Sequence, residues 1–262
     1  MVRAKDVEVR VIPRNDANAI VKRVHYSGSV VPNSQIHLGV FIGGRIHGAM
    51  QFGPPMDRRK VLPMVDGAGW ESVIELNRMA FDEALPRNSE SRALGVAFRM
   101  FREKAPQVRW CVSFADGAQC GDGTIYRASG FVLTGIKPNA QILVFPGGER
   151  ATAKSLTTVG FACREAMAKK YGVKLGGSAS LAPFIAVGAK PIPGFQLRYV
   201  RFIDPSWLAR LTVPVIPFAD IPADARMYLG VRRPVGGSGV QPETGGSSPT
   251  PTLHPSPAAG DP

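Results

Sequence analysis

The chain has 262 residues, of which 44% are hydrophobic, and this is enough to build one domain with a sizeable core. Its 32 Lys and Arg residues outnumber its 20 Asp and Glu residues, and the net charge of +12 favours a polyanionic partner such as nucleic acid, with plain solubility as the alternative. No run of about 18 apolar residues occurs and the N-terminal segment is rich in charge, so we expect no membrane span, no signal peptide and a cytoplasmic protein.

The first half of the sequence alternates strand-like and helix-like patterns. The expected elements are a short helix, a β-hairpin, a single strand and a long helix, over residues 16–23, 36–42 with 45–52, 72–80 and 88–104. Gly43 and Gly44 suit the two-residue turn of the hairpin, because glycine accepts positive φ angles. The long helix has one apolar face, whose residues are spaced i, i+3, i+4 and i+7: Leu94, Ala97, Phe98 and Phe101. Asn88 or Ser89 is expected to cap this helix, and Pro106 ends it.

The second half of the sequence contains more strands than helices. The expected elements are strands over 109–114, 131–136, 141–145, 196–203 and 213–217, a short helix over 123–129 and a longer basic helix over 151–171. Gly130 is expected to close the short helix. This order of hairpin, strand, helix and strand predicts a mixed α/β fold with one central sheet flanked by helices.

The composition of the chain changes near residue 234. Beyond this point Gly, Pro, Ser and Thr dominate, and there is almost nothing to bury against a core. We therefore expect a disordered tail over residues 234–262, after a single folded domain over residues 1–233. All 32 basic residues and 18 of the 20 acidic residues precede the tail, so the expected domain has a formal charge of +14.

The cysteines argue against a secreted protein and against a zinc site. Cys111, Cys120 and Cys163 are odd in number and widely spaced, without a CxxC pair. Small secreted domains have an even number of cysteines in a disulfide framework, and zinc sites use closely spaced pairs. The pattern fits a reducing cytoplasm.

Five stretches of the sequence are similar to one known family. They are HYSGSVVPNSQIHLGVF (25–41), GAMQFGPPMDRRK (48–60), ELNRMAFDEALPRNSESRALG (75–95), SFADGAQCGDGTIYRASGFVLTG (113–135) and FQLRYVRFIDPSW (195–207). They resemble the phage Mom DNA-modification proteins, and the resemblance extends over roughly residues 22–230. It implies a GNAT-like acyltransferase fold. In this fold one strand splays away from its neighbour, and the next helix presents its N-terminus to a phosphate-bearing acyl donor.

The resemblance also implies an activity. Mom-type enzymes convert adenine in phage DNA to N6-carbamoylmethyladenine, which shields the DNA from host restriction enzymes. The implied partners are double-stranded DNA, with phosphate contacts and a flipped adenine, and a small-molecule or carrier-bound donor in the host-cell cytoplasm. Acetyl-CoA, another acyl or glycyl donor, and iron are the candidate cofactors. The alternatives are an ordinary GNAT N-acetyltransferase acting on a small amine or a protein lysine, and a non-catalytic DNA-binding protein.

Asp116 and Tyr126 are the expected catalytic pair. Asp116 follows the strand over 109–114, at the edge where α/β sheets place their chemistry, and would accept a proton from the adenine N6 amine. Tyr126 matches the position where many GNAT enzymes keep a tyrosine that protonates the leaving group. The alternatives are an Asx-turn residue for Asp116 and a core aromatic for Tyr126.

His25 and Tyr26 complete the catalytic set. They follow the first expected helix, where GNAT folds form one wall of the acceptor site. Tyr26 would stack on a flipped base, and His25 would move a proton or bind a metal. The alternative is that both side chains only pack a loop.

Four residues are weak candidates for iron ligands, namely His25, His37, Cys120 and Asp122. No HxxxH or CxxC spacing supports them. His37 and His47 are not expected to share a metal, because a regular hairpin would place Val40 opposite His47 and put the two histidines on opposite faces.

Arg78, Asn77, Ser91 and Arg87 are the expected donor-binding residues. Regular alternation would put Arg78 on one face with apolar neighbours, namely Ile74, Leu76 and Ala80, and a buried arginine needs an anionic partner. A structural ion pair is the alternative. Asn77 would lie on the opposite face, where its amide could read an adenine edge. Ser91 and Arg87 belong to the turn that opens the long helix, whose N–H groups attract anions.

The same turn departs from the usual GNAT pattern. Glu90 and Arg92 stand where the family's donor turn has two glycines, and a carboxylate would repel a pyrophosphate. This weakens the case for acetyl-CoA. The alternative is a simple capping arrangement at the helix start.

Two basic clusters are expected to contact DNA phosphates. Arg58, Arg59 and Lys60 follow the hairpin, and Lys169 and Lys170 lie near the end of the expected basic helix. Arg164 and Lys174 extend the second cluster. Such contacts give affinity without sequence information, and scattered solvated side chains are the alternative.

Overall fold

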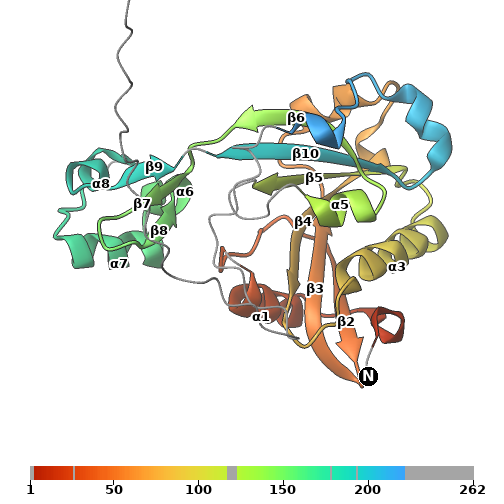
Figure 1. The fold of residues 1–262 in the computed structure, drawn as a ribbon, viewed down its shortest axis with the longest axis horizontal. Helices are drawn as coiled ribbons and strands as arrows, with labels where there is room; N and C mark the ends of the chain where they lie inside the picture. Colours follow the sequence, from red (N-terminus) through yellow and green to blue (C-terminus); the bar gives the residue numbers. More distant parts are fainter. Residues whose placement is uncertain (1–2, 26, 117–122, 178, 193, 222–262) are drawn as a thin grey trace, which may run out of the picture.

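The computed structural model describes residues 3–25, 27–116, 123–177, 179–192 and 194–221 (Figure 1). Its main sheet has the strand order β1 (Glu8–Val11), β2 (Ile36–Ile42), β3 (Arg45–Gly53), β4 (Val73–Phe81), β5 (Trp110–Asp116), β10 (Phe195–Phe202) and β6 (Val132–Pro138). The helices around this sheet are α1 (Arg14–Val24), α2 (Arg58–Val61), α3 (Ser89–Lys104) and α5 (Thr124–Ala128). The expected mixed α/β class is confirmed.

The pairing between β4 and β5 is short. These two strands are parallel and joined only over Val73–Glu75 and Trp110–Val112, whereas the other paired strands of the described sheet are antiparallel. Beyond Glu75 the strands diverge, so that β4 runs toward the bottom of Figure 1 while β5 points to the left. The splayed strand expected of a GNAT-like fold is therefore present.

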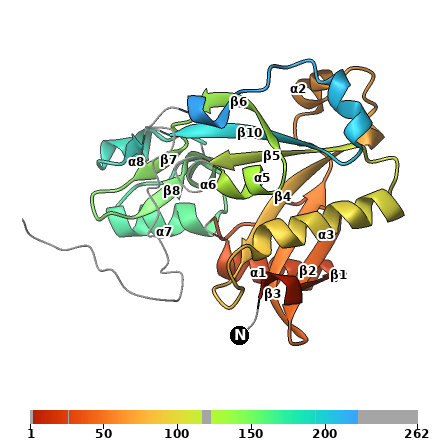
Figure 2. The ribbon, with the colours of Figure 1, turned by 45° about the vertical axis from the view of Figure 1, so that its right-hand side comes forward.

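Different helices cover the two faces of the main sheet (Figures 1 and 2). α3 packs on one face, and its predicted apolar stripe contributes Leu94, Phe98 and Phe101 to the largest core cluster. α1 lies on the opposite face against β3 and β4. Val61 of α2 joins a further cluster with Trp110 and Val112. The apolar periodicity of the sequence thus correctly predicted which face of α3 is buried.

A β-bulge at Asn77 changes which side chains β4 presents to each face. The register between β3 and β4 slips by one residue here, so Asn77 has no cross-strand partner. Leu76 packs in the core under α3, whereas Ala80 packs under α1. The expectation that Leu76 and Ala80 both share a face with Arg78 is therefore wrong for Leu76, because one inserted residue reverses the alternation beyond it.

The hairpin is confirmed, with one change of register. Gly43 and Gly44 close it at φ angles of 55° and 76°, which glycine adopts without strain. Next to the turn, Val40 pairs with Gly48 and not with His47, as a regular hairpin would require. His47 is the extra residue of this bulge.

A second, three-stranded sheet lies between β6 and β10 in the sequence and was not expected from it. Its order is β8 (Arg150–Thr152), β7 (Ile142–Val144) and β9 (Lys190–Ile192), and its helices are α6 (Ala153–Thr157), α7 (Ala162–Tyr171) and α8 (Ala182–Ala186). It has a hydrophobic cluster of its own around Phe145, Leu156 and Phe184, and lies to the left in Figure 1. The expected helix over 151–171 is wrong, because β8 takes its first residues and Gly160, at a φ of 75°, separates α6 from α7.

The expected strand over 213–217 is also wrong. Ile216 forms a single bridge with Leu133, and the flanking Pro214 and Pro217 have no N–H to extend it. Short 3-10 helices cover Ala4–Asp6, Leu62–Met64, Trp70–Ser72, Pro205–Arg210 and Phe218–Asp220. The other expected strands and helices are confirmed. In the part of the chain that the structure describes, no helix has the length and hydrophobicity needed to cross a bilayer.

Candidate active site

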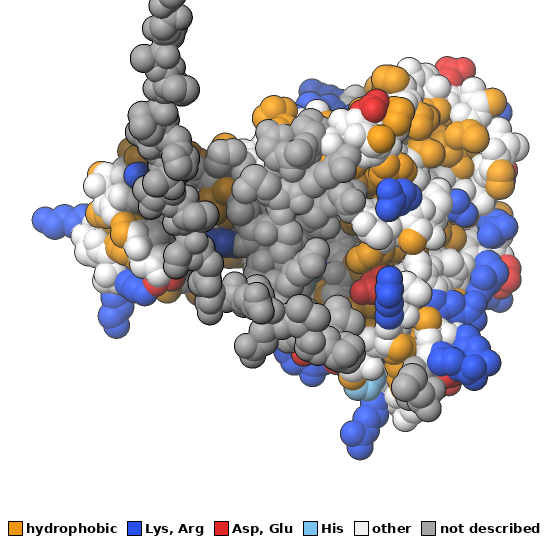
Figure 3. Space-filling model, viewed as in Figure 1, with side chains coloured by type: hydrophobic (Ala, Val, Ile, Leu, Met, Phe, Trp, Pro, Cys, Tyr) orange, Lys and Arg blue, Asp and Glu red, His pale blue; other side chains and the backbone are white. Residues whose placement is uncertain are grey.

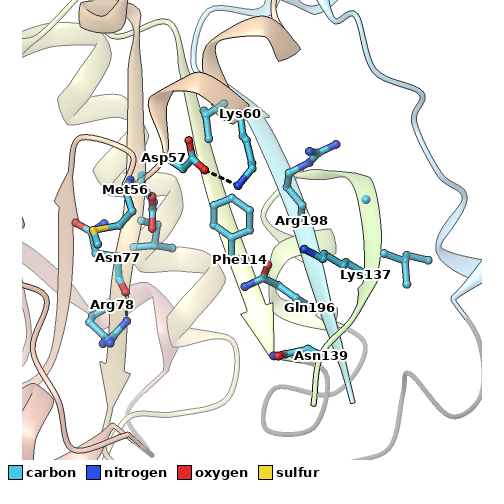
Figure 4. Close-up of a pocket in the computed structure, with 15 residues that line it drawn as sticks. Met56, Asp57, Lys60, Asn77, Arg78, Phe114, Lys137, Asn139, Gln196 and Arg198 are labelled. Atoms are coloured by element: carbon cyan, nitrogen blue, oxygen red, sulfur yellow. Dashed lines mark hydrogen bonds and ion pairs between the residues drawn. The ribbon is translucent and has the colours of Figure 1, made fainter. Parts of the chain in front are cut away.

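A cleft of about 670 Å³ opens where β4 and β5 diverge (Figure 4). Its walls come from the loop after β3, from β4, from the end of β5 and from the facing strands β6 and β10. Most of its lining side chains are polar or charged: Asp57, Lys60, Glu75, Asn77, Arg78, Lys137, Asn139, Gln196 and Arg198. Such a cleft suits a polar ligand.

The bulge in β4 brings Asn77 and Arg78 to the same cleft, although regular alternation would place them on opposite faces. Asn77 Oδ1 accepts a hydrogen bond of 3.0 Å from Ser34 Oγ. Arg78 is half-buried, and its Nε and Nη1 donate to the carbonyl oxygens of Ser29 and Asn77 at 2.9 and 2.7 Å. These two bonds fix the orientation of the guanidinium at the cleft.

Glu75 is a carboxylate of the cleft that the sequence did not single out. Its Oε2 accepts a hydrogen bond of 3.1 Å from the Met56 backbone N–H. Burial raises the pKa of Glu75, and this effect outweighs the hydrogen bonds from Met56 and Asn77 and the charge of Arg78, which favour the ionised form. Among the described residues, Asn77 Nδ2 has no hydrogen-bond partner within normal geometry. It is nevertheless close enough to the Glu75 carboxylate to favour the ionised form and so lower the pKa of Glu75.

The opposite wall carries two cations and an aromatic ring. Arg198 donates from Nε and Nη2 to the hydroxyl and carbonyl oxygens of Thr134, at 3.1 and 2.7 Å, and burial lowers its pKa. Gly135 leaves room for this guanidinium, since a Cβ there would lie 3.3 Å from it. Lys137 is exposed and extends from β6, and Phe114 presents its ring between the two walls (Figure 4). This wall can attract an anion and stack a planar group.

Asp116 ends β5 at the edge of this cleft. Its backbone pairs with Gln196, which lines the cleft. The side chain of Asp116 lies outside the described part of the structure, as do Cys120 and Asp122. The backbone position is therefore compatible with the predicted role.

Tyr126 lies on the other face of the sheet, under α3. Its side chain is 9% exposed, and its ring stacks on Tyr199 with centroids 4.6 Å apart. Its hydroxyl accepts a hydrogen bond of 3.0 Å from Ser113 Oγ, which also reaches the Leu76 carbonyl oxygen at 3.3 Å. Ser113 directly follows Val112, the last residue of β5 that pairs with β4. Tyr126 is thus a core aromatic whose hydroxyl points to the base of the splay.

His25 lies close to Arg78, at the end of α1. The Ser27 backbone N–H donates to His25 Nδ1 at 3.1 Å, and Ser27 Oγ lies 2.8 Å from the same nitrogen. The neutral ring therefore carries its proton on Nε2. Burial, and then the charge of Arg78, lower the pKa of His25 to about 3. His25 is neutral at physiological pH, and Tyr26 lies outside the described residues.

The start of α3 has no side-chain cap in the described structure. Asn88 occupies the cap position with a φ of 70°, but its side chain makes no capping bond. The hydroxyls of Ser89 and Ser91 instead donate to the carbonyl oxygens of Pro86 and Asn88, at 2.6 and 3.1 Å. The capping alternative is therefore not realised. The Ser89 backbone N–H donates to the Pro86 carbonyl oxygen at 3.2 Å, and the N–H groups of Glu90 and Ser91 are the ones oriented toward an anion at this helix start. Arg87 is exposed beside them.

The predicted DNA-contacting residues differ in their environments. Arg58, Arg59 and Lys60 are all exposed on α2, and Lys60 pairs with Asp57 at 2.7 Å. Lys169 is exposed on α7. Two further residues of that helix are engaged within the protein, because Lys170 pairs with Glu149, and Arg164 is buried and donates to the Gly176 carbonyl at 3.1 Å. Lys174 is exposed as well.

The predicted metal ligands do not converge in the described structure. Among the described residues, no group of three His, Cys, Asp or Glu side chains is placed to hold a metal ion. His37 is buried and lies 3.3 Å from Gln51 Nε2, whereas His47 lies 3.2 Å from Asp82. In this arrangement neither ring nitrogen of His25 has a lone pair left to bind a metal ion, because Nδ1 accepts a hydrogen bond from Ser27 and Nε2 carries the proton. The described residues therefore do not fit the iron site considered from the sequence.

Sequence reasoning placed Asn77, Arg78 and Lys60 at the site and missed most of the rest of its lining. The missed residues include Met56, Glu75, Phe114, Lys137, Gln196 and Arg198. Glu75 gave a usable signal, since it is an acidic residue in an apolar strand. Gln196 and Arg198 gave none, because their position depends on β10 inserting between β5 and β6.

The family model described as the Mom protein family matches residues 6–220. The chain belongs to the Mom protein family. It is 40% identical over 136 residues to the methylcarbamoylase mom of Escherichia phage Mu, over 50% of this chain and 55% of that protein. The chain thus spans about half the length of this curated relative.

Solved structures with a similar arrangement are acetyltransferases. A Bacillus subtilis acetyltransferase in complex with CoA shares 8% identity at a TM-score of 0.41, over 75% of this chain and 97% of that one. The ribosomal-protein-S18-alanine N-acetyltransferase of Escherichia coli shares 10% identity at a TM-score of 0.41, over 76% and 94%. Similarity at this level carries no argument about the reaction of this Mom-family protein.

Proposed function

We propose that this Mom-family protein is a phage DNA modification enzyme that converts adenine in double-stranded DNA to N6-carbamoylmethyladenine, and so protects phage DNA from host restriction. The observation that carries the proposal is the polar cleft at the β4–β5 splay, in a chain that belongs to the Mom family. The 40% identity to a methylcarbamoylase supports the type of group transferred.

The cleft suits a flipped base. The N6 amine of adenine is enclosed by the stack and the base pair, so an enzyme must extrude the base to reach it. The volume of about 670 Å³ is within the range of pockets that bind small molecules. Phe114 offers a ring for stacking, and the amides of Asn77 and Gln196 offer a donor and an acceptor for an adenine edge.

The chemistry is assigned to residues on both faces of the splay. Asp116 is the proposed general base, which takes a proton from N6 as the new bond to carbon forms. Tyr126 is the proposed acid for the leaving group. Its hydroxyl contacts Ser113 at the base of the splay and does not line the cleft, so this role requires the leaving group to reach the base of the splay. His25 and Tyr26 are proposed to wall the acceptor site. Since its pKa is about 3, His25 acts there as a neutral hydrogen-bond donor through Nε2.

The donor is proposed to bind between β4 and the start of α3. Arg78 and Asn77 would hold its reactive end, and Arg87, Ser91 and the uncapped N–H groups of α3 would hold an anionic part such as a phosphate. Acetyl-CoA or another acyl or glycyl donor with an anionic part suits the basic groups here. Acetyl transfer alone lacks the amide nitrogen of the carbamoylmethyl group, so the donor or a co-reactant must also supply that nitrogen, as a glycyl donor would.

The DNA duplex is proposed to lie across the basic residues beside the cleft. Lys60 lines the cleft, and Arg58 and Arg59 are exposed beside it on α2. Lys169 is exposed on α7 of the second sheet, apart from α2 (Figure 2), and other Lys and Arg side chains are spread over the face shown in Figure 3. Lys170 pairs with Glu149 and would have to leave that partner to reach a phosphate. These contacts would supply sequence-independent affinity.

Mass spectrometry of nucleosides from the DNA of cells that express the protein tests the proposal. We expect N6-carbamoylmethyladenine, and none in cells that carry the empty vector. Unmodified DNA together with a shift of intact DNA in gel electrophoresis would favour a non-catalytic DNA-binding protein. Acetylation of a small amine or a protein lysine, with unmodified DNA, would favour an ordinary N-acetyltransferase. Either result would refute the proposal.

A further inference from the structure

Met56 is an apolar side chain at the rim of a polar cleft. It lines the cleft, yet it is 63% exposed, which ranks it among the most exposed large hydrophobic residues of the described chain. Figure 4 shows Met56 at the mouth of the cleft on the β4 side, above Asn77. Singly exposed hydrophobic residues are common on protein surfaces. Met56 differs from Val11, Trp70 and Val159, which are similarly exposed, because it also lines the cleft.

The backbone that carries Met56 is fixed. Its N–H donates to Glu75 Oε2 at 3.1 Å, which ties the loop to β4. Asn33 Nδ2 donates to the Pro54 carbonyl oxygen at 2.9 Å, and Pro55 is buried. Two consecutive prolines further restrict the chain before Met56. The side chain is therefore presented to solvent from a rigid support.

Three cationic residues follow Met56 in the sequence. Arg58, Arg59 and Lys60 follow it within four residues and are exposed. The Arg58 guanidinium lies 5.3 Å from the centroid of the Trp70 ring. An apolar tip beside several phosphate-binding groups is the arrangement by which proteins insert a side chain between DNA bases.

We infer that Met56 is the wedge that enters the DNA stack at the place a flipped adenine leaves, an inference that rests on the proposed function. A base that turns into the cleft leaves a gap in the duplex, and the gap is unfavourable unless an apolar group fills it. Met56 stands where the base would pass, and its long polarisable side chain fits an irregular space. Trp70 is a weaker candidate, because Arg58 covers one face of its ring and it does not line the cleft.

Fluorescence of 2-aminopurine, an adenine analogue that brightens when it is unstacked, measures the effect. The probe is a pool of duplexes with one 2-aminopurine in randomised flanking sequence, and the same strands without complement. Met56→Ala should reduce the fluorescence rise in duplex by about tenfold and change binding to the single strands by less than about twofold, because a single strand has no gap to fill. Met56→Leu should retain most of the rise.

Val215→Ala is the matched control, since Val215 is 51% exposed and does not line the cleft. It should behave as wild type, and the melting temperatures of all variants should agree within a few degrees. An equal loss on duplex and single strand would show that Met56 only lines a binding pocket, and wild-type behaviour of Met56→Ala would show that it has no role. Either outcome overturns the inference.

The amount of modified adenine in cells distinguishes this failure from failure of the proposed function. If wild type modifies DNA and Met56→Ala modifies it equally well, the wedge role of Met56 is refuted and the enzyme assignment stands. If wild type leaves DNA unmodified, the proposed function is wrong, and the wedge fails with it.

Discussion

Acid should destabilise this protein through His25. Its ring is largely enclosed and lies beside Arg78, and the Ser27 N–H donates to Nδ1, so a second proton has no favourable place. His25→Asn removes the titrating group and keeps an oxygen near the position of Nδ1 to accept from Ser27. The comparison therefore isolates the cost of protonation.

The size of the effect follows from the pKa of His25, which burial and Arg78 lower from 6.5 to about 3. Between these values the unfolded chain binds a proton that the folded chain does not, so the free energy of unfolding rises with pH in this window and falls on acidification. From pH 7 to pH 5 the loss due to His25 is about 2 kcal/mol, and it grows by about 1.4 kcal/mol per further pH unit until pH 3.

Denaturant unfolding at pH 7, 6 and 5 measures this loss. Wild type should lose about 2 kcal/mol more than His25→Asn between pH 7 and 5. His47→Asn is the control, because it removes another histidine and leaves His25 in place, so it should keep the steep acid dependence of wild type. Parallel loss of stability in wild type and His25→Asn would refute the reasoning, and with it the neutral state that we assign to His25 in the acceptor wall.

Three further predictions concern activity, DNA affinity and the tail. Asp116→Asn keeps the size of the side chain and removes its basicity, so modified adenine measured by mass spectrometry should fall by roughly two to four orders of magnitude at unchanged melting temperature; full modification would redirect the search for the base. Replacing Arg58, Arg59 and Lys60 with Ala should weaken binding alike on all DNA sequences and reduce the slope of log affinity against log salt by up to about three units, whereas an unchanged slope in filter-binding assays would remove this cluster from the interface. Truncation after Arg233 removes no basic residue and no apolar periodicity, so thermal melting and DNA modification should match the full chain, and loss of modification at unchanged stability would make the tail functional.

Local patterns in the sequence predicted most of the elements. The apolar spacing from Leu94 to Phe101 identified α3 and the face that it buries, and Gly43-Gly44 located the hairpin turn. These features depend on short-range backbone preferences and on the period of one element, which a single sequence displays directly. The quoted motifs also identified the family, which the match over residues 6–220 confirms.

Prediction failed where distant segments decide the outcome. The helix expected over 151–171 is divided, because β8 pairs with β7 and leaves only Ala153 onward to helices. The face assigned to Arg78 was wrong because the register between β3 and β4 slips at Asn77. A bulge is stabilised by packing on both faces of a sheet, and no pattern within the sequence of β4 alone predicts it.

The sequence by itself thus determined most of the elements, the family and a short set of polar candidates, of which Asn77, Arg78 and Lys60 share the cleft. Only the tertiary structure decided that the bulge turns both Asn77 and Arg78 into this cleft, and that burial beside Arg78 keeps His25 neutral. The same holds for Arg198, which reaches the cleft because β10 inserts between β5 and β6. The physical reason is that strand order, register and burial arise from contacts between residues far apart in the chain, whereas periodicity and turn chemistry are local.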